Sequence, residues 1–260
     1  MNADRLNVLI DLFFKDLPME QRIARIAACG YRAVETWQGG DAPLLVKIGE
    51  ACRAAGVTLV SVVLNGPSDM TVAPVLRSNR QAFLDRVDRF SDNALAAGGR
   101  AGIVCSGNLV EDCTRAEQHD SIIEALRVAG EMVAAKGFAL NVEPLNTPVD
   151  HKGYFLDSRD EALAIVKAVN LPNVRMLYDI YHMQIMHGNQ LDFILPNVAN
   201  IGHFHTAGVP GRHELFNGES NYPFILGKII QAGYRGHFGL EYMPELESAQ
   251  SLTRTREHIG

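Results

Sequence analysis

The sequence has no hydrophobic run long enough to cross a membrane, since its longest apolar stretch, near residues 57–64, is far shorter than the ~18 residues that a spanning helix needs. Positive charge is also in short supply: 24 Lys and Arg stand against 30 Asp and Glu, for a formal net charge of −6. A general nucleic-acid binder carries a basic stripe. We therefore expect neither a membrane nor a nucleic acid as a partner.

Cysteine is scarce, with four residues in 260 and no C-x-x-C pair. Small disulfide-stabilised domains and structural zinc sites carry more cysteine at closer spacing. The first residues, in which Asp4 and Arg5 precede a strand-like run, do not resemble a secretory signal peptide. These features favour buried, reduced thiols and a cytoplasmic location.

Glycine-rich phosphate loops are absent as well, since neither G-x-G-x-x-G nor G-x-x-x-x-G-K-[ST] occurs in the chain. Their absence disfavours an open, doubly wound nucleotide-binding sheet. The composition, with 47% hydrophobic and 21% charged residues, is that of an ordinary globular protein. No linker or low-complexity stretch divides it, so we predict a single domain over residues 1–260.

Short apolar runs alternate with helical patterns along the whole chain. Between the runs, apolar residues recur at helical spacing, as Ile122, Leu126, Ala129 and Val133 do. Strands that alternate with helices predict a parallel sheet, and eight such units in 260 residues predict a (β/α)8 TIM barrel. The eight predicted strands are residues 6–14, 33–37, 58–64, 101–106, 139–145, 175–180, 201–206 and 237–242.

Local signals mark where the helices begin and end. Thr114 with Glu117, and Ser158 with Glu161, fit the capping box, in which two unpaired backbone N–H groups find side-chain acceptors. Five glycines follow periodic runs and suit the left-handed position just past a helix. They are Gly30, Gly56, Gly98, Gly137 and Gly233.

The last four predicted strands each end near one side chain that can bind a metal ion. These side chains are Glu143, Asp179, His205 and Glu241. Adjacent parallel strands lie about 4.8 Å apart, so side chains at one level can converge where barrel enzymes place their chemistry. Three carboxylates and one imidazole favour one divalent cation, Mg²⁺ or Mn²⁺, with Co²⁺ or Zn²⁺ as further candidates.

Two more residues are candidates for contacting a substrate. His182 follows Asp179 by three residues, and Arg212 lies in the polar loop after the seventh strand. Because three carboxylates repel an anion, an anionic substrate needs a cation beside the metal, and arginine binds carboxylates bidentately. A hydrogen-bonded loop histidine, and a surface pair of Arg212 with Glu214 or Glu219, are the alternatives. We expect His203 to be a buried structural residue and His151 a surface residue.

Motifs between residues 139 and 245 resemble the hydroxypyruvate isomerase family, which is one of the xylose isomerase-like barrels. They are NVEPLN, YDIYHMQIMHGN, PGRHEL, GESNYPF and GLEYMPE. The resemblance implies a (β/α)8 barrel with one divalent cation bound by Glu143, Asp179, His205 and Glu241. It also implies that Glu143 and Glu241 form the acid/base pair, and that His182 and Arg212 contact substrate oxygens.

The implied activity is a metal-dependent isomerisation of a sugar or keto acid by a 1,2-proton shift through a cis-enediolate. Hydroxypyruvate, converted to tartronate semialdehyde, or a related 2-oxo sugar acid is the expected substrate. His205 departs from this pattern, because family members with that activity typically carry glutamine there and the ketose epimerases carry histidine. The segment 35–40 also departs from it.

The alternatives are a ketose 3-epimerase acting on neutral sugars and a lyase or decarboxylase acting on a sugar-derived keto acid. An endonuclease IV-like enzyme needs further metal ligands and a basic face, which this sequence does not clearly supply. A sugar-binding protein without catalysis is the non-enzyme alternative. The resemblance is compatible with a homodimer or homotetramer, with Trp37 or residues 65–75 as candidate contacts.

Overall fold

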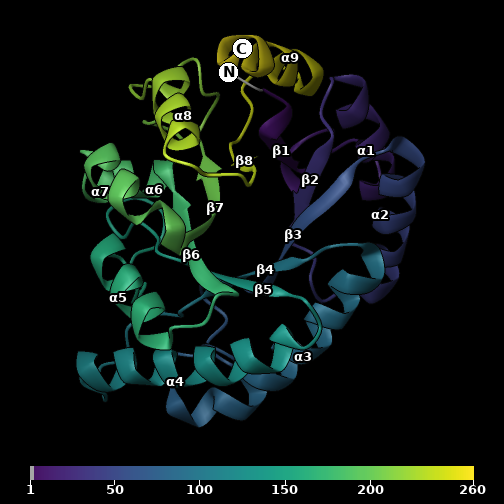
Figure 1. Cartoon of the computed structure of the whole chain (residues 1–260). Coiled ribbons are helices and arrows are strands. Elements are labelled where there is room, and N and C mark those ends of the chain that lie inside the picture. The colour runs from purple at the N-terminus through teal and green to yellow at the C-terminus, as the bar shows by residue number, and fades with distance from the viewer. Residues whose placement is uncertain (1–2) are drawn as a thin grey trace.

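The computed structural model describes residues 3–260, and within them eight parallel strands close into one barrel in chain order (Figure 1). Each strand pairs with the next one along the chain, and β8 pairs with β1. The predicted (β/α)8 TIM barrel is therefore confirmed. The strands are β1 (Leu6–Leu9), β2 (Ala33–Thr36), β3 (Thr58–Asn65), β4 (Ala101–Cys105), β5 (Ala139–Glu143), β6 (Val174–Asp179), β7 (Ile201–Thr206) and β8 (Phe238–Leu240).

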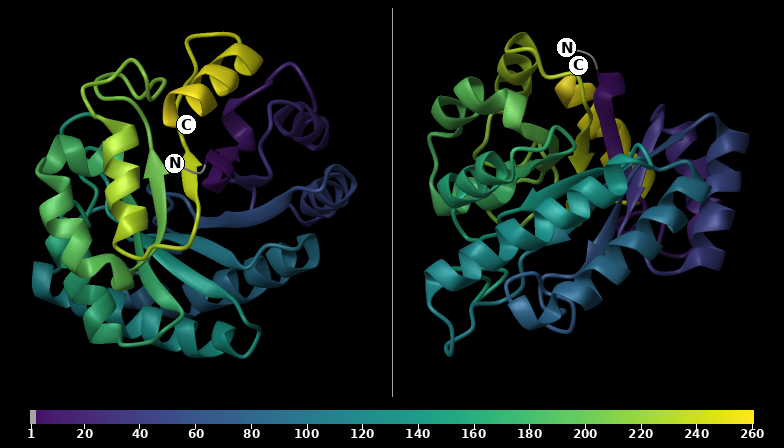
Figure 2. Two further views of the ribbon diagram at one scale, coloured as in Figure 1. Left: turned by 45° about the horizontal axis from the view of Figure 1, so that its top comes forward. Right: turned by 60° about the horizontal axis from the view of Figure 1, so that its bottom comes forward.

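The α-helices form a ring outside the barrel and shield it from solvent (Figures 1 and 2). Helix α9 closes the ring, because it lies beside β1 and brings the last part of the chain next to the first (Figure 1). The described helices are α1 (Met19–Ala28), α2 (Ala42–Ala55), α3 (Arg80–Ala97), α4 (Arg115–Ala134), α5 (Arg159–Val169), α6 (Ile180–Met186), α7 (Gln190–Asn197), α8 (Tyr222–Gln231) and α9 (Ser248–Ile259).

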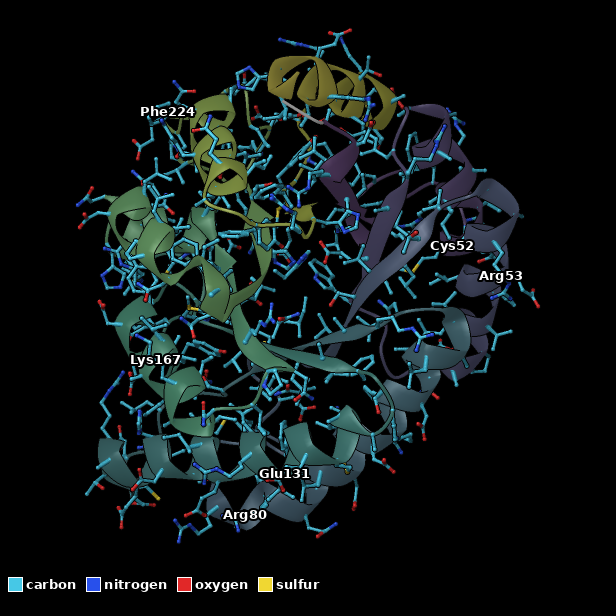
Figure 3. The ribbon with its side chains drawn as sticks, in the orientation of Figure 1. Cys52, Arg53, Arg80, Glu131, Lys167 and Phe224 are labelled. Atoms are coloured by element: carbon cyan, nitrogen blue, oxygen red, sulfur yellow. The ribbon has the colours of Figure 1, made fainter. Side chains whose placement is uncertain are left out.

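Each helix turns its apolar side toward the barrel. On α2, Cys52 is buried between the helix and the strands, whereas the next residue, Arg53, points outward into solvent (Figure 3). The apolar groups so buried form one continuous core, and Phe224 on α8 is an exception that stays 54% exposed. Over residues 3–260, no helix combines the length and the apolar character needed to cross a membrane.

Three predicted strands run two or more residues past their observed ends. The first ends at Leu9, because a short 3-10 helix, Ile10–Leu12, follows it, and the fifth and eighth end at Glu143 and Leu240. The apolar residues beyond these ends lie outside the strands but are still buried: Leu145 and Tyr242 are almost fully enclosed, and the Tyr242 hydroxyl contacts Ser251 and Thr255 of α9. Apolar character alone therefore extends a predicted strand past the point where the barrel pairing stops.

The predicted helix signals are largely confirmed. Thr114 and Glu117 form the complete capping box at the start of α4. Ser158 caps α5 through the Glu161 N–H, but the Glu161 carboxylate pairs with Arg115, so the second half of that box does not form. All five predicted stop glycines have positive φ, between 63° at Gly56 and 103° at Gly233.

Replacing Thr114 with alanine is expected to lower the free energy of unfolding by about 1 kcal/mol, since an N-cap contributes about 0.5–2 kcal/mol. The lost interaction is the bond that the Glu117 N–H donates to the Thr114 hydroxyl, 3.2 Å long. Urea unfolding followed by circular dichroism measures the change. Thr114→Ser keeps the acceptor and should stay near wild type. Equal stability of the Ala variant and wild type would contradict this account.

Candidate functional site

Four side chains converge at the carboxyl ends of the last four strands. They are Glu143 at the end of β5, Asp179 at the end of β6, His205 in β7 and Glu241 directly after β8. One ligand atom from each lies within 4.8 Å of the others, and all four residues are buried. The structure thus brings together the four residues that the sequence singled out as metal ligands.

Strand register and local capping set this geometry. Asp179 lies directly opposite His205 in the β6–β7 pairing. The Glu241 N–H donates to the Thr206 carbonyl, which holds Glu241 at the level of the end of β7. Asp179 also caps α6, because its Oδ1 accepts the N–H groups of Tyr181 and His182 at 2.7 and 3.2 Å. The carboxylate is therefore fixed by the helix that it starts.

Burial and neighbouring charges shift the pKa values of the carboxylates in this cluster. Burial raises the pKa of Glu143 and raises that of Asp179 to about 7. Burial also opposes ionisation of Glu241, but His205 and Arg212 outweigh it and hold the pKa of Glu241 well below its ordinary value. Two of the three carboxylates thus resist ionisation in this enclosed space, and a divalent cation at its centre would favour their charged forms.

The donor atoms fit a hard divalent cation. Among the described residues, Glu143 Oε1 and His205 Nδ1 are buried and make no hydrogen bond. His205 Nδ1 lies 3.3 Å from Glu143 Oε1 and 3.2 Å from Glu241 Oε2. Buried polar atoms normally have partners, so these unpaired atoms facing one point are what a metal site requires. Three carboxylates and one imidazole match the preferences of Mg²⁺ or Mn²⁺.

Arg212 reaches the same cluster. It is one of the few described non-glycine residues with positive φ, 60°, and its Nη2 donates to Glu241 Oε2 at 2.5 Å. The guanidinium also lies over the Tyr181 ring, 5.3 Å from the centroid. The alternative surface pair does not form: the buried Glu214 carboxylate accepts N–H groups from the segment after β8, and Glu219 accepts from Gln184. Arg212 therefore contacts the four clustered side chains through Glu241 rather than forming a surface pair.

The tautomer of His182 follows from its neighbours. Asn146 Oδ1 accepts the N–H groups of Val149 and Asp150, so its amide nitrogen must be the atom 2.6 Å from His182 Nδ1. The Asn146 backbone N–H points at the same ring nitrogen. With donors at Nδ1 and with burial lowering the pKa of His182, the neutral ring carries its hydrogen on Nε2. That buried N–H makes no hydrogen bond within the described chain, and its neighbour is Asp179 Oδ2 at 3.5 Å.

A cavity of about 400 Å³ opens beside the cluster. One part of its wall is charged or polar, and the other is apolar. Within the described chain its lining consists of Trp37, Val63, Gly66, Pro67, Cys105, Glu143, Leu145, His151, His182, His205, Arg212 and Glu241. This volume suits a small molecule with a few polar groups rather than a polymer.

Several of these residues were not predicted from the sequence. Trp37 was expected only as a candidate subunit contact, yet its indole N–H donates to Glu241 Oε1 at 3.0 Å. His151 was expected on the surface, and that is wrong: it lines the cavity, with its ring centroid 5.3 Å from that of His182. Trp37 directly follows β2, so applying the strand-end argument to all eight strands would have found it.

Below the cluster, His203 is buried, as predicted, and binds Glu35. Glu35 lies on β2 and is buried as well. Burial opposes its ionisation, but His205 and His203 lower the pKa of Glu35 to about 2. The sequence signal for it was a charged residue inside an otherwise apolar strand.

Comparison with known proteins agrees with this geometry. Residues 23–258 match the family model of the xylose isomerase-like TIM barrel. A 2-oxo-tetronate isomerase from Cupriavidus necator is 30% identical over 259 residues, covering 96% of this chain and 97% of that protein. A putative hydroxypyruvate isomerase from Streptomyces coelicolor is 34% identical over 266 residues, covering 96% of this chain and 94% of that protein.

A solved structure supports the same assignment. The crystal structure of an AP endonuclease, family 2, from Brucella melitensis superposes with a TM-score of 0.88 at 32% identity, covering 96% of this chain and 97% of that one. The chain therefore belongs to the xylose isomerase-like TIM barrel family and is an enzyme of the isomerase class.

Proposed function

We propose that this protein is a metal-dependent isomerase of short sugar acids, which moves a proton between adjacent carbons of an α-hydroxy carbonyl group. Hydroxypyruvate and 2-oxo-tetronate, the compounds in the names of its relatives, define the substrate class. The observation that carries the proposal is that Arg212 and the cluster of Glu143, Asp179, His205 and Glu241 belong to one small site, so that a carboxylate and the reacting carbons can be held together.

Glu143, Asp179, His205 and Glu241 would hold the cation, which supplies a Lewis acid for the hydroxyl and carbonyl oxygens of the substrate. Mg²⁺ or Mn²⁺ is the ion of choice for this set of donors. The apolar part of the cavity wall excludes water, which strengthens the electrostatic contacts and protects the enediolate between the two proton transfers.

We assign to Glu143 both the removal of the proton from the first carbon and its return to the second, and to Glu241 the transfer of the substrate hydroxyl proton from one oxygen to the other, so that both carboxylates end as they began. Burial raises the pKa of Glu143, which makes it the stronger base, and its Oε1 makes no hydrogen bond. Glu241 is held by Trp37 and Arg212 and is the weaker base. The Nε2–H of His182 is the donor for a substrate oxygen, and Arg212 binds the substrate carboxylate.

A ketose 3-epimerase acting on neutral sugars is the second candidate, and one observation favours it. The imidazole of His205 occupies the position at which the ketose epimerases carry histidine. The two functions differ in what Arg212 does, since a neutral sugar has no carboxylate for it to bind. A lyase or decarboxylase acting on a keto acid would share the same first proton transfer.

Proton NMR in D₂O tests the proposal directly. The protein is treated with EDTA, and hydroxypyruvate is followed before and after Mg²⁺ is added. We expect tartronate semialdehyde, with deuterium at the carbon that receives the proton, only after the metal is restored. Deuterium exchange in a neutral ketohexose but not in hydroxypyruvate would favour the epimerase. Equal turnover with and without metal would refute the metal-dependent mechanism.

A further inference from the structure

A second cluster of buried polar side chains lies inside the barrel and shares His205 with the first. Glu35 projects from β2, while His203 and His205 project from β7. All three are buried, at 1–2% exposure. Glu35 Oε2 lies 2.9 Å from His203 Nε2, and Glu35 Oε1 lies 3.3 Å from His205 Nε2. One carboxylate thus faces two imidazoles: Oε2 is hydrogen-bonded to His203, whereas Oε1 lies within ion-pair distance of His205 Nε2 but is not aligned for a hydrogen bond.

The sheet makes room for this contact. Gly239 on β8 lies opposite His205 in the strand pairing. A Cβ atom at position 239 would lie 2.2 Å from Glu35 Oε1 and 2.7 Å from His205 Cδ2. Only a residue without a side chain lets the Glu35 carboxylate reach past β8 to β7.

The geometry also settles which ring atom faces which partner. His205 turns Nδ1 toward Glu143 and Glu241, and turns Nε2 toward Glu35. Carboxylates face both ring nitrogens, so both can carry a hydrogen; a cation bound among Glu143, Asp179 and Glu241 would replace the hydrogen on Nδ1 and leave the one on Nε2 toward Glu35. A ring with Nε2–H offers the Nδ1 lone pair to a metal.

We propose that Glu35 is a positioning residue that holds His205 by its Nε2–H and so presents Nδ1 to the divalent cation. The proposal rests on the metal site of the proposed function. Partners that hydrogen-bond to the far nitrogen of a ligating histidine fix its tautomer and orientation, and their loss weakens metal affinity about 10–100-fold.

The same three residues lie close enough together to hold an ion, but they are less suited to one than the first cluster. The distance of 2.9 Å between Glu35 Oε2 and His203 Nε2 is a direct hydrogen bond. These two atoms therefore already have a partner, unlike Glu143 Oε1 and His205 Nδ1. We therefore expect one cation per chain.

Titration of the metal-free protein with Mn²⁺ by isothermal titration calorimetry tests the role of Glu35. Trp37 is the only tryptophan and donates to Glu241, so its fluorescence reports whether the ion binds at this site. We expect about 100-fold weaker binding for Glu35→Leu and about tenfold weaker binding for Glu35→Gln, which keeps one acceptor oxygen. His203→Asn, in the same cluster but without contact to the ion, should lose less than tenfold.

The outcomes separate this inference from the proposed function. Suppose that the wild type binds Mn²⁺ and that Glu35→Leu and Glu35→Gln bind it with unchanged affinity. This result would refute the role of Glu35 but would still support the metal site. Wild type without Mn²⁺ binding refutes both. Two ions per chain would show that the second cluster binds metal after all, and would overturn the positioning role.

Nitrogen-15 NMR of the Mg²⁺-loaded protein gives a readout that does not depend on affinity. In wild type, His205 should carry a hydrogen on Nε2 that exchanges slowly and resonates downfield. In Glu35→Gln this signal should shift upfield and exchange faster, because an amide oxygen is a weaker acceptor. If Glu35→Leu does not fold, the Nε2–H signal of Glu35→Gln still tests the role of Glu35. An unchanged signal in Glu35→Gln would refute the proposal.

Discussion

Replacing Glu143 with glutamine is expected to lower kcat/KM by about 10³–10⁴-fold, near the top of the range for a general base. Glutamine keeps the size and polarity of the side chain, but it cannot accept a proton. Its amide also replaces a carboxylate in a cluster where Glu143 Oε1 faces His205 at 3.3 Å. The substitution should therefore prevent proton removal and change the electrostatic potential at the substrate, while the barrel stays folded.

Initial rates with hydroxypyruvate at saturating Mg²⁺ measure this loss, and a thermal melt checks folding. Mg²⁺ must be saturating because Glu143 is also an assigned metal ligand. Otherwise weaker metal binding could be mistaken for the loss of base catalysis. Glu245→Gln is the matched control, since Glu245 is exposed four residues after Glu241 and lines no part of the cavity. A Glu143→Gln enzyme with wild-type kcat would remove Glu143 from the mechanism.

The barrel could be predicted because every local signal agrees with it. Apolar strands, capping residues such as Thr114 and stop glycines such as Gly56 all divide the chain at the same points. A fold can be predicted from a sequence when its hydrophobic pattern, helix caps and turn residues all agree. The ends of the strands were harder to predict, because Leu145 and Tyr242 are as buried and apolar as strand residues but lie outside the strands.

The four clustered side chains were predictable for a geometric reason. Parallel strands place their carboxyl ends on one face of the barrel, so strand-end residues far apart in sequence must meet there. Glu143 and Glu241 are separated by nearly a hundred residues, yet both lie within the same small cluster. The barrel topology alone predicts that these two residues lie near each other.

Glu35 and Trp37 show that position in a strand does not reveal what a side chain contacts. Their importance depends on atoms contacted across the barrel: Glu35 meets His203 and His205, and Trp37 meets Glu241. Such contacts depend on side-chain direction and on the space left by residues such as Gly239. The sequence pattern of a single strand predicts neither the direction of a side chain across the barrel nor the space available to it.

Arg212 connects the two loops that complete the site. Its backbone carbonyl accepts the N–H of Met243, while its side chain binds Glu241. The buried Glu214 ties the same loop to the segment after β8 through the N–H groups of Glu245 and Leu246. The arginine is therefore held in place before a substrate arrives, which reduces the entropy lost on binding.

Replacing Arg212 with alanine is expected to lower kcat/KM for hydroxypyruvate by about 10²–10³-fold, since removing one partner of a buried charged hydrogen bond costs about 2–5 kcal/mol. Glu241 occupies Nε and Nη2 in the described structure, so we assign Nη1 to the substrate carboxylate. Most of the loss should fall on KM, because the carboxylate is bound in the ground state as well as in the transition state.

The main rival explanation is that the variant acts through Glu241, which loses a partner at 2.5 Å. Mn²⁺ titration distinguishes the two, since a disturbed Glu241 changes metal affinity whereas a lost carboxylate contact does not. Arg212→Lys should recover only part of the loss, because an ammonium group cannot hold Glu241 through two nitrogens and the substrate through a third. Arg53→Ala, on the outer face of α2, is the control (Figure 3). If Arg212→Ala kept the wild-type KM for hydroxypyruvate, the sugar-acid assignment would fail and a neutral substrate would be favoured.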